Sequence, residues 1–177
     1  MRFLLLTSLA ATTSMSILKV AQSSTLWPQP ANVTLDDTSF AGVAATFAFT
    51  ATGTAASGSA LLKRAFQRYE TLLKPAERSV TTPLMTMVSP VTTLAVEVDQ
   101  AGDTIAFGVD ESYTLQWDLA AQQPQQQQTP TLHAKTVFGA LRGLETFVQI
   151  AENDNVAHAV PLQLPVTAQV SDGPRFS

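Results

Sequence analysis

Two segments of the chain carry apolar residues at the spacing of an amphipathic α-helix. The first runs from Ser59, which is suited to cap its start, to Lys74, where Pro75 ends it. The second follows Thr136, another candidate cap, and continues to Ala151. The predicted buried faces are Leu62, Ala65, Phe66, Tyr69, Leu72 and Leu73 in the first helix, and Val137, Leu141, Leu144, Val148 and Ala151, widened by Phe138 and Phe147, in the second.

The second predicted helix contains two glycines four residues apart, Gly139 and Gly143. Each costs roughly 1 kcal/mol relative to alanine in a helix interior. Their presence therefore predicts that another backbone or a bulky ring passes close to this helix. On its exposed side, Arg142 and Glu145 are expected to form an intrahelical pair.

Other segments alternate apolar and polar residues, which is typical of β-strands with one buried face. Thr52–Ser59 is expected to be a turn, and the low-complexity segment Gln122–Pro130 a loose hairpin loop. Val160–Val170, interrupted by Pro161 and Pro165, is expected to be an edge strand or an extended exit segment. The predicted strands are Val43–Ala51 (with Val43, Ala45, Phe47 and Phe49 on one side), Thr93–Gln100, Ser112–Leu119 and Thr131–Lys135.

This order of strands and helices predicts one domain of the α/β class, in its α+β form: one mostly antiparallel sheet with two helices packed on it. Leu26–Pro30 is expected to be an extended segment that leads into the domain and anchors through Trp27. The net charge of −4 and the absence of a Lys/Arg cluster argue against nucleic acid as a partner. The chain has no cysteine, so it forms no disulfide and performs no thiol chemistry.

Residues 1–23 are expected to be a signal peptide, which leaves residues 24–177 as the mature domain. Arg2 precedes the apolar run Phe3–Ala11, and Ala21-Gln22-Ser23 offers a cleavage pattern of small residues. The apolar run is too short for a membrane span. Asn32 begins a glycosylation sequon, Asn32-Val33-Thr34, which matters if the chain enters the secretory pathway.

Candidate catalytic groups are sparse. Asp110-Glu111 resembles the carboxylate pairs that divide the work of glycoside cleavage, but it directly precedes a predicted strand, where a solvated turn is the favoured interpretation. The two histidines, His133 and His158, lack ligand-spaced partners, so no metal site is expected, and His133 is interpreted as a packed or edge histidine. Gly58-Ser59-Ala60 is interpreted as a helix start, since no nucleophile elbow and no glycine-rich phosphate loop occurs. No cofactor is expected.

Five separated segments resemble the N-terminal domain of eukaryotic β-N-acetylhexosaminidases. They follow one another in the family's order, which makes them specific together although each is weak alone. They are Leu26–Pro30 (L-W-P-x-P), Ala65–Tyr69 (A-F-x-R-Y), Glu111–Leu115 (E-S-Y-T-L), the helix segment Ala134–Ile150 (around T-V-F-G-A-L-R-G-L-E-T-F) and Asp172–Phe176 (D-x-P-R-F).

This resemblance implies an α/β domain that precedes a catalytic (β/α)₈ barrel, with dimers common in the family. The barrel removes terminal N-acetylglucosamine or N-acetylgalactosamine with retention: the substrate's acetamido oxygen is the nucleophile, an Asp orients it, and a neighbouring Glu protonates the leaving oxygen. A sugar-binding Arg in a P-x-R-G stretch follows the D-x-P-R-F segment in the family. Neither this Arg nor the Asp-Glu pair has a counterpart here, since Asp110-Glu111 belongs by position to the E-S-Y-T-L strand.

The sequence therefore predicts a leader and the non-catalytic N-terminal domain of a β-hexosaminidase, inactive alone, whose partner is a barrel outside this chain. The expected destination is the secretory pathway, ending outside the cell or in a lysosome-like or vacuole-like compartment. Animal lysosomal members carry a disulfide in this domain, so the absence of cysteine is a departure from them. The alternative is a free-standing secreted accessory or glycan-binding module, in which Trp27, Trp117 and Tyr113 would stack on a sugar if exposed; Trp117 and Tyr113 alternate with polar residues and are expected in the core.

Overall fold

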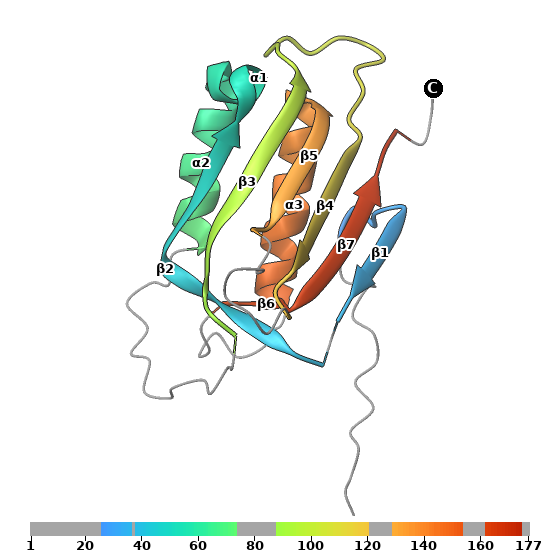
Figure 1. The fold of residues 1–177 in the computed structure, drawn as a ribbon. Helices are drawn as coiled ribbons and strands as arrows, with labels where there is room; N and C mark the ends of the chain where they lie inside the picture. Colours follow the sequence, from blue (N-terminus) through green and yellow to red (C-terminus); the bar gives the residue numbers. More distant parts are fainter. Residues whose placement is uncertain (1–25, 37, 74–87, 121–128, 154–161, 175–177) are drawn as a thin grey trace, which may run out of the picture.

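The strands of the chain form one sheet, and two of its helices pack on one side of that sheet. The computed structural model describes residues 26–36, 38–73, 88–120, 129–153 and 162–174 (Figure 1). The strands are β1 (Asn32–Leu35), β2 (Phe40–Thr52), β3 (Val91–Gln100), β4 (Tyr113–Asp118), β5 (Thr131–Thr136), β6 (Gln163–Pro165) and β7 (Thr167–Asp172). The helices are α1 (Gly53–Gly58), α2 (Ala60–Leu73) and α3 (Val137–Asn153).

The described strands lie in the order β1-β7-β4-β5-β3-β2-β6. The pairs β1–β7, β7–β4, β4–β5 and β2–β6 are antiparallel, and β5–β3 and β3–β2 are parallel. The prediction of a mostly antiparallel sheet is confirmed. The two parallel pairs arise at the centre, where α1 and α2 connect β2 to β3 and where β4 lies between β3 and β5 in the sequence but on the far side of β5 in the sheet.

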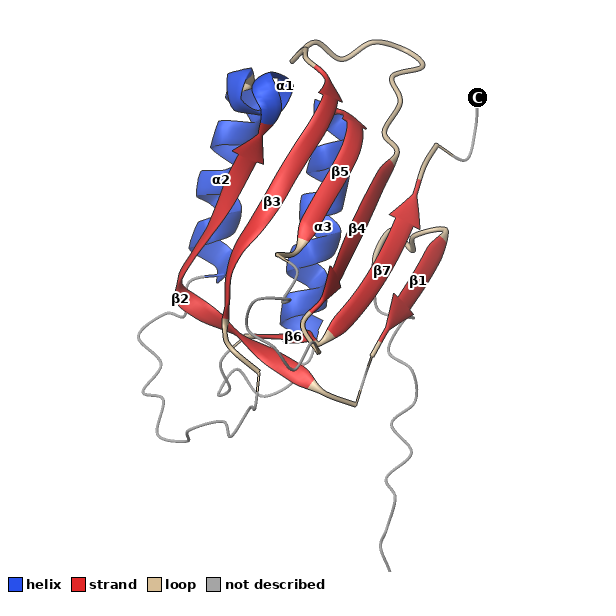
Figure 2. Cartoon of the chain, viewed as in Figure 1, coloured by secondary structure: helices blue, strands red, loops and turns tan. Residues whose placement is uncertain are grey.

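Helices α2 and α3 cover one face of the sheet, and the opposite face is left open (Figures 1 and 2). The alternation of each strand sends its apolar residues toward the helices, as in β4, where Tyr113, Leu115 and Trp117 are buried. The open face, defined as the sheet surface opposite α2 and α3, is polar. Its exposed side chains include Asn32, Thr34, Glu97, Asp99, Thr114, Gln116, Asp118, Lys135 and Gln169.

Phe147 of α3 lies at the centre of the core. Its fully buried ring stacks on Phe47 at 5.7 Å between centroids and meets the edges of Phe49 and Trp117 at 6.1 and 5.8 Å. The indole N–H of Trp117 donates to the carbonyl oxygen of Pro165 at 2.8 Å, so its one polar group is satisfied inside the core. This aromatic group joins β2, β4 and α3.

The predicted helix starts are confirmed. The Ser59 Oγ accepts the backbone N–H of Leu62 at 3.1 Å, and the Thr136 Oγ1 accepts that of Gly139 at 3.3 Å. The prediction of a close neighbour at the two glycines of α3 is confirmed as well. A Cβ on Gly139 would collide with the backbone carbonyl of Ser112, and a Cβ on Gly143 would collide with Leu132 and lie 3.0 Å from the Tyr113 ring.

Three details of the predicted helices are wrong. Thr52–Ser59 is not a turn, because it contains the short helix α1. Leu72 was expected in the buried face of α2, but 48% of it is exposed. Arg142 and Glu145 do not pair with each other: Arg142 Nε bonds Glu111 at 2.9 Å, and Glu145 accepts the Tyr69 hydroxyl at 2.7 Å. Tertiary partners with better geometry replace the local pair.

The two ends of the domain also differ from the predictions. Val160–Val170 yields two strands, of which β6 lies at an edge while β7 is inside the sheet, because the unpredicted strand β1 covers it. In β2, Phe47 and Phe49 are buried but Ala45 is exposed, because the register with β3 shifts between Val43 and Ala48. Trp27 is 82% exposed, so its ring is not buried against the described residues as an anchor would be.

The segment that leads into the domain is instead held through Leu26 and a backbone clamp. Leu26 is buried, and the Gln149 side-chain amide of α3 accepts from the N–H and donates to the carbonyl of Trp27, both at 2.7 Å. Pro75, His158 and most of Gln122–Pro130 lie outside the described residues, but β4 and β5 do pair as the predicted hairpin requires. Among the helices that the structure describes, none has the length and apolar character needed to cross a membrane.

Tyr69 connects α2 to α3 and supplies a pH-dependent contribution to stability. Burial, aided by the hydrogen bond to Glu145, raises the pKa of Tyr69 to about 12. The folded state favours the neutral hydroxyl, so this contribution is complete below the ordinary pKa of 10.0 and is lost as pH rises toward 12. We expect Tyr69→Phe to flatten the loss of stability above pH 10, measured by urea unfolding of both proteins near neutral pH and above pH 10. An equally steep alkaline loss in the variant would contradict this origin.

Candidate functional site

The carboxylate pair Asp110-Glu111 occupies a solvated turn ahead of β4. Asp110 Oδ1 accepts the backbone N–H of Ser112 at 2.8 Å, and Glu111 Oε2 pairs with Arg142 at 2.9 Å. Hydrogen bonds from Ser112 hold the pKa of Asp110 below its ordinary value. A general acid needs a raised pKa, and the hydrogen bonds from Ser112 favour the ionised form of Asp110 instead. The solvated-turn interpretation is therefore confirmed.

His133 lies on the open face of β5, between Glu97 of β3 and Thr114 of β4 in the strand register. Its Nε2 lies 2.9 Å from Asp99 Oδ1, and Lys135 Nζ lies 3.0 Å from the other oxygen of the same carboxylate. The expectation of a packed or edge histidine is wrong: β5 is an inner strand, and 40% of the His133 side chain is exposed. The Asp99 carboxylate on this exposed face therefore forms an ion pair with Lys135 and a hydrogen bond with His133.

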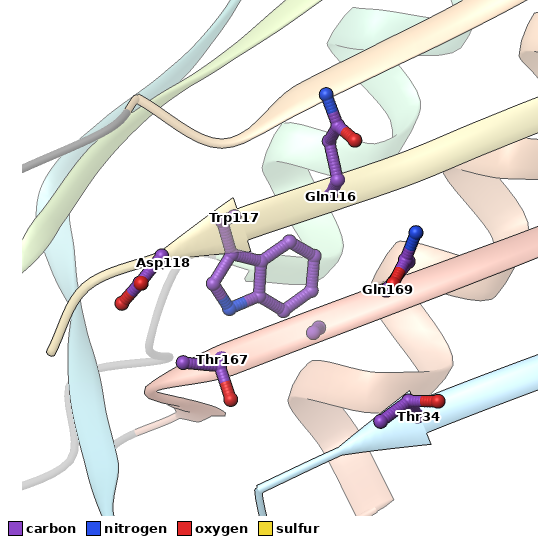
Figure 3. Close-up of a pocket in the computed structure, with 7 residues that line it drawn as sticks. Thr34, Gln116, Trp117, Asp118, Thr167 and Gln169 are labelled. Carbon is purple, nitrogen blue, oxygen red and sulfur yellow. The ribbon is translucent and has the colours of Figure 1, made fainter.

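A shallow hollow of about 350 Å³ indents the open face where β1, β7 and β4 meet (Figure 3). Hydroxyl, amide and carboxylate groups line it, and Asp118 is the one carboxylate among them. Asp118 already accepts the backbone N–H of Ala120 at 2.9 Å. Acid–base cleavage of a glycoside needs a second group of this kind. The lining residues are Thr34, Gln116, Trp117, Asp118, Thr167, Ala168 and Gln169.

Metal ligands and sugar-stacking rings are the remaining kinds of site that the sequence raised. Throughout the described ranges, His, Asp and Glu residues gather in no group of three or more that could hold a metal ion. Trp117 and Tyr113 are buried as expected, with 3% and 4% exposure, so neither ring is available to a sugar. The Tyr113 hydroxyl is hydrogen-bonded to Thr146 Oγ1 at 2.7 Å, so its polar group is satisfied inside the core.

Sequence reasoning missed Asp103, which holds the β3–β4 connection against the start of α2. Its Oδ2 accepts the backbone N–H groups of Ala60 and Leu61 at 2.8 and 3.1 Å, and its Oδ1 accepts the Ser59 hydroxyl at 2.5 Å. A carboxylate at a helix N-terminus satisfies otherwise unpaired donors and complements the helix dipole. Asp103 is 44 residues from Ser59, so no local capping pattern pointed to it.

Asp103 is expected to make the stability of the domain depend on acidic pH. Hydrogen bonds from Ser59, Leu61 and Ala60 lower the pKa of Asp103 from its ordinary 3.8. Its contribution is therefore present above pH 3.8 and is lost as pH falls through the lowered folded value. We expect Asp103→Ala to lower the thermal midpoint at neutral pH and to make the acid decline shallower, with Thr104→Ala as the matched control. Unchanged midpoints for Asp103→Ala at both pH values would contradict this assignment.

Comparisons with known proteins find relatives of this chain among the β-hexosaminidases. The family model described as beta-acetyl hexosaminidase like matches residues 26–150. Beta-hexosaminidase 1 of Arabidopsis thaliana is 31% identical over 182 aligned positions, covering 98% of this chain and 32% of that protein. Beta-hexosaminidase subunit A2 of Dictyostelium discoideum is 30% identical over 118 positions, covering 67% of this chain and 19% of that protein.

A solved structure shows the same fold. The X-ray structure of Flavobacterium johnsoniae chitobiase matches with a TM-score of 0.61 over 90% of this chain and 22% of that chain, at 23% sequence identity. The chain spans about a third of the length of the Arabidopsis relative. Because the family model covers residues 26–150, most of the described domain, the chain belongs to the beta-acetyl hexosaminidase-like family.

Proposed function

We propose that this chain is the N-terminal supporting domain of a β-N-acetylhexosaminidase, which removes terminal N-acetylglucosamine or N-acetylgalactosamine from glycoconjugates or chitin oligomers. The catalytic work belongs to a (β/α)₈ barrel that follows the domain, and the chain alone turns over no substrate. The relatives support this assignment through their names and through their length, since this chain matches about a third of the Arabidopsis protein.

One observation carries the proposal: the family match lies on a domain whose described residues lack a poised acid–base pair. Asp110 and Glu111 are held by Ser112 and Arg142, and the hollow on the open face contains Asp118 as its one carboxylate. An enzyme of this family needs an Asp and a neighbouring Glu at the sugar. A domain with the family's sequence and without that pair fits a supporting role.

The same assignment extends to processing and location. Residues 1–23 act as a signal peptide, and the product is secreted or delivered to a lysosome-like or vacuole-like compartment. Asn32 is a glycosylation site in this proposal, supported by its exposure on the outer strand β1, where its amide N–H donates to Ser171 Oγ at 3.1 Å. The complete enzyme is expected to form dimers through its barrel. The free-standing glycan-binding alternative is not favoured, because two of its three candidate rings, Trp117 and Tyr113, are buried and only Trp27 is exposed.

A chimera tests the supporting role. Residues 24–174 of this chain would replace the matching segment of Arabidopsis Beta-hexosaminidase 1, and activity would be measured on a chromogenic N-acetylglucosaminide. We expect the chimera to be active and a truncated Arabidopsis protein without any N-terminal domain to be insoluble or unstable. A soluble, folded chimera without turnover would contradict the proposal. Treatment of the secreted protein with an N-glycosidase, with Asn32→Gln as control, tests the glycosylation site separately.

A further inference from the structure

The connection between β3 and β4, residues 101–112, displays two large apolar side chains to solvent. Ile105 is 69% exposed and Phe107 is fully exposed. The described ranges contain four exposed large hydrophobic residues, and two of them are in this one connection; the others are Trp27, at 82%, and Leu72, at 48%. Two apolar residues together at the tip of one loop are a candidate contact for another protein surface.

This 101–112 loop is fixed at both of its ends. At the β3 side, Asp103 binds the N-terminus of α2. At the β4 side, the Thr136 hydroxyl donates to the backbone carbonyl of Asp110 at 2.6 Å, and Glu111 pairs with Arg142. Between these points a turn bonds the Val109 N–H to the Ala106 carbonyl at 3.3 Å. The tip is therefore held in place before any partner binds, which lowers the entropy cost of association.

The described chain leaves the sheet beside the base of this loop. Asp172, the last residue of β7, pairs with Tyr113, the first residue of β4. Gly173 follows, and a Cβ on it would lie 3.4 Å from the Cβ of Ser112, the last residue of the loop. Figure 1 shows β7 ending at the same end of the sheet as the β3–β4 connection. The described chain thus leaves the sheet at the end where the loop with Ile105 and Phe107 lies, beside the base of that loop.

We propose that Ile105 and Phe107 form a docking element that packs against the catalytic portion of the enzyme. The inference rests on the proposed function, because the occupant is the polypeptide by which the relatives exceed this chain in length. Two observations support this occupant: the described chain leaves the sheet beside the base of the loop, and contacts at both ends of the loop hold it with its apolar residues exposed. Burial of a Phe side chain is enough to strengthen such a contact by about tenfold or more.

A single introduced thiol reports on this contact, because the chain has no cysteine of its own. Ala106→Cys places the thiol between Ile105 and Phe107 and leaves both apolar residues in place, and Gln169→Cys on the open face is the matched control. Each variant is made in the isolated chain and in the chimera with the Arabidopsis catalytic portion. The rate of alkylation by a maleimide is followed by mass spectrometry of the peptide that contains the introduced cysteine.

We expect Cys at position 106 to react at least about tenfold more slowly in the chimera than in the isolated chain, as for a site exposed only by transient opening. The control at position 169 should react equally in both, and adding Phe107→Ser to the chimera should restore the fast rate at position 106. Equal rates at position 106 in an active chimera would overturn the docking element alone. Slow, concentration-dependent labelling in the isolated chain would assign the tip to a second copy and overturn it too. A folded chimera without turnover would instead overturn the proposed function beneath it.

Discussion

Replacing Phe147 by alanine is expected to lower the free energy of unfolding by about 3–5 kcal/mol, the range for a large aromatic residue removed from a core. Phe147 is fully buried and contacts the rings of Phe47, Phe49 and Trp117 from two strands. These neighbours belong to two strands of the sheet, so we expect the cavity to close only partly, and the loss then combines the transfer term and the cavity term. Urea unfolding followed by circular dichroism measures it.

Phe107→Ala is the matched control for that substitution. It removes the same atoms from a fully exposed position, so the isolated chain should unfold within about 0.5 kcal/mol of the unchanged protein. Equal losses for Phe147→Ala and Phe107→Ala would contradict the location of the core.

Gly139→Ala is expected to destabilise the domain by about 1–2 kcal/mol, although alanine is the better helix former by about 1 kcal/mol. The added Cβ would collide with the backbone carbonyl oxygen of Ser112 and lie 3.1 Å from the carbonyl carbon of Glu111. These are backbone atoms that α3 and β4 hold in place, so no change of side-chain rotamer can relieve the clash. The steric cost therefore exceeds the gain in helix propensity.

Gly58→Ala provides the comparison, because a Cβ on Gly58 would meet nothing within 4 Å. Thermal unfolding of the two variants should show a lower midpoint for Gly139→Ala and an unchanged or slightly higher midpoint for Gly58→Ala. A stabilised Gly139→Ala variant would mean that α3 lies farther from β4 than the structure shows.

The parts of the fold that local patterns specify could be predicted from the sequence. The apolar periodicity identified α2 and α3, and the pair Gly139 and Gly143 indicated a close neighbour of α3 without revealing which one. Position within the sheet was harder. β1 alternates polar and apolar residues over only four positions, which is too short a run to stand out, and its pairing with β7, far along the chain, decides that β7 is an inner strand. A pairing over that sequence distance leaves no local signal.

Polar contacts could likewise be predicted where the partners are adjacent in the sequence, and were missed where the partners are far apart. Ser59 and Thr136 were identified because a cap and its helix are adjacent in the sequence. Asp103 was missed because it reaches α2 from another connection, and the expected Arg142–Glu145 pair was wrong because Glu111 and Tyr69 compete for these groups. The ring of Trp27 was expected to anchor the segment that leads into the domain. The backbone of Trp27 and the buried Leu26 hold that segment instead.

The family resemblance was carried by five short segments. Each is a weak signal alone, but together they follow one another in the family's order, which is specific. The same resemblance predicted no counterpart of the family's catalytic Asp and Glu, and the structure adds that Asp110 and Glu111 have structural partners.

The most direct test of the central claim is an assay of the purified 177-residue chain on a chromogenic N-acetylglucosaminide. We predict a rate equal to the blank without enzyme, because the described residues contain no acid–base pair placed for glycoside cleavage. Steady turnover that disappears in the double variant Asp110→Asn/Glu111→Gln would contradict the account and make this domain itself catalytic.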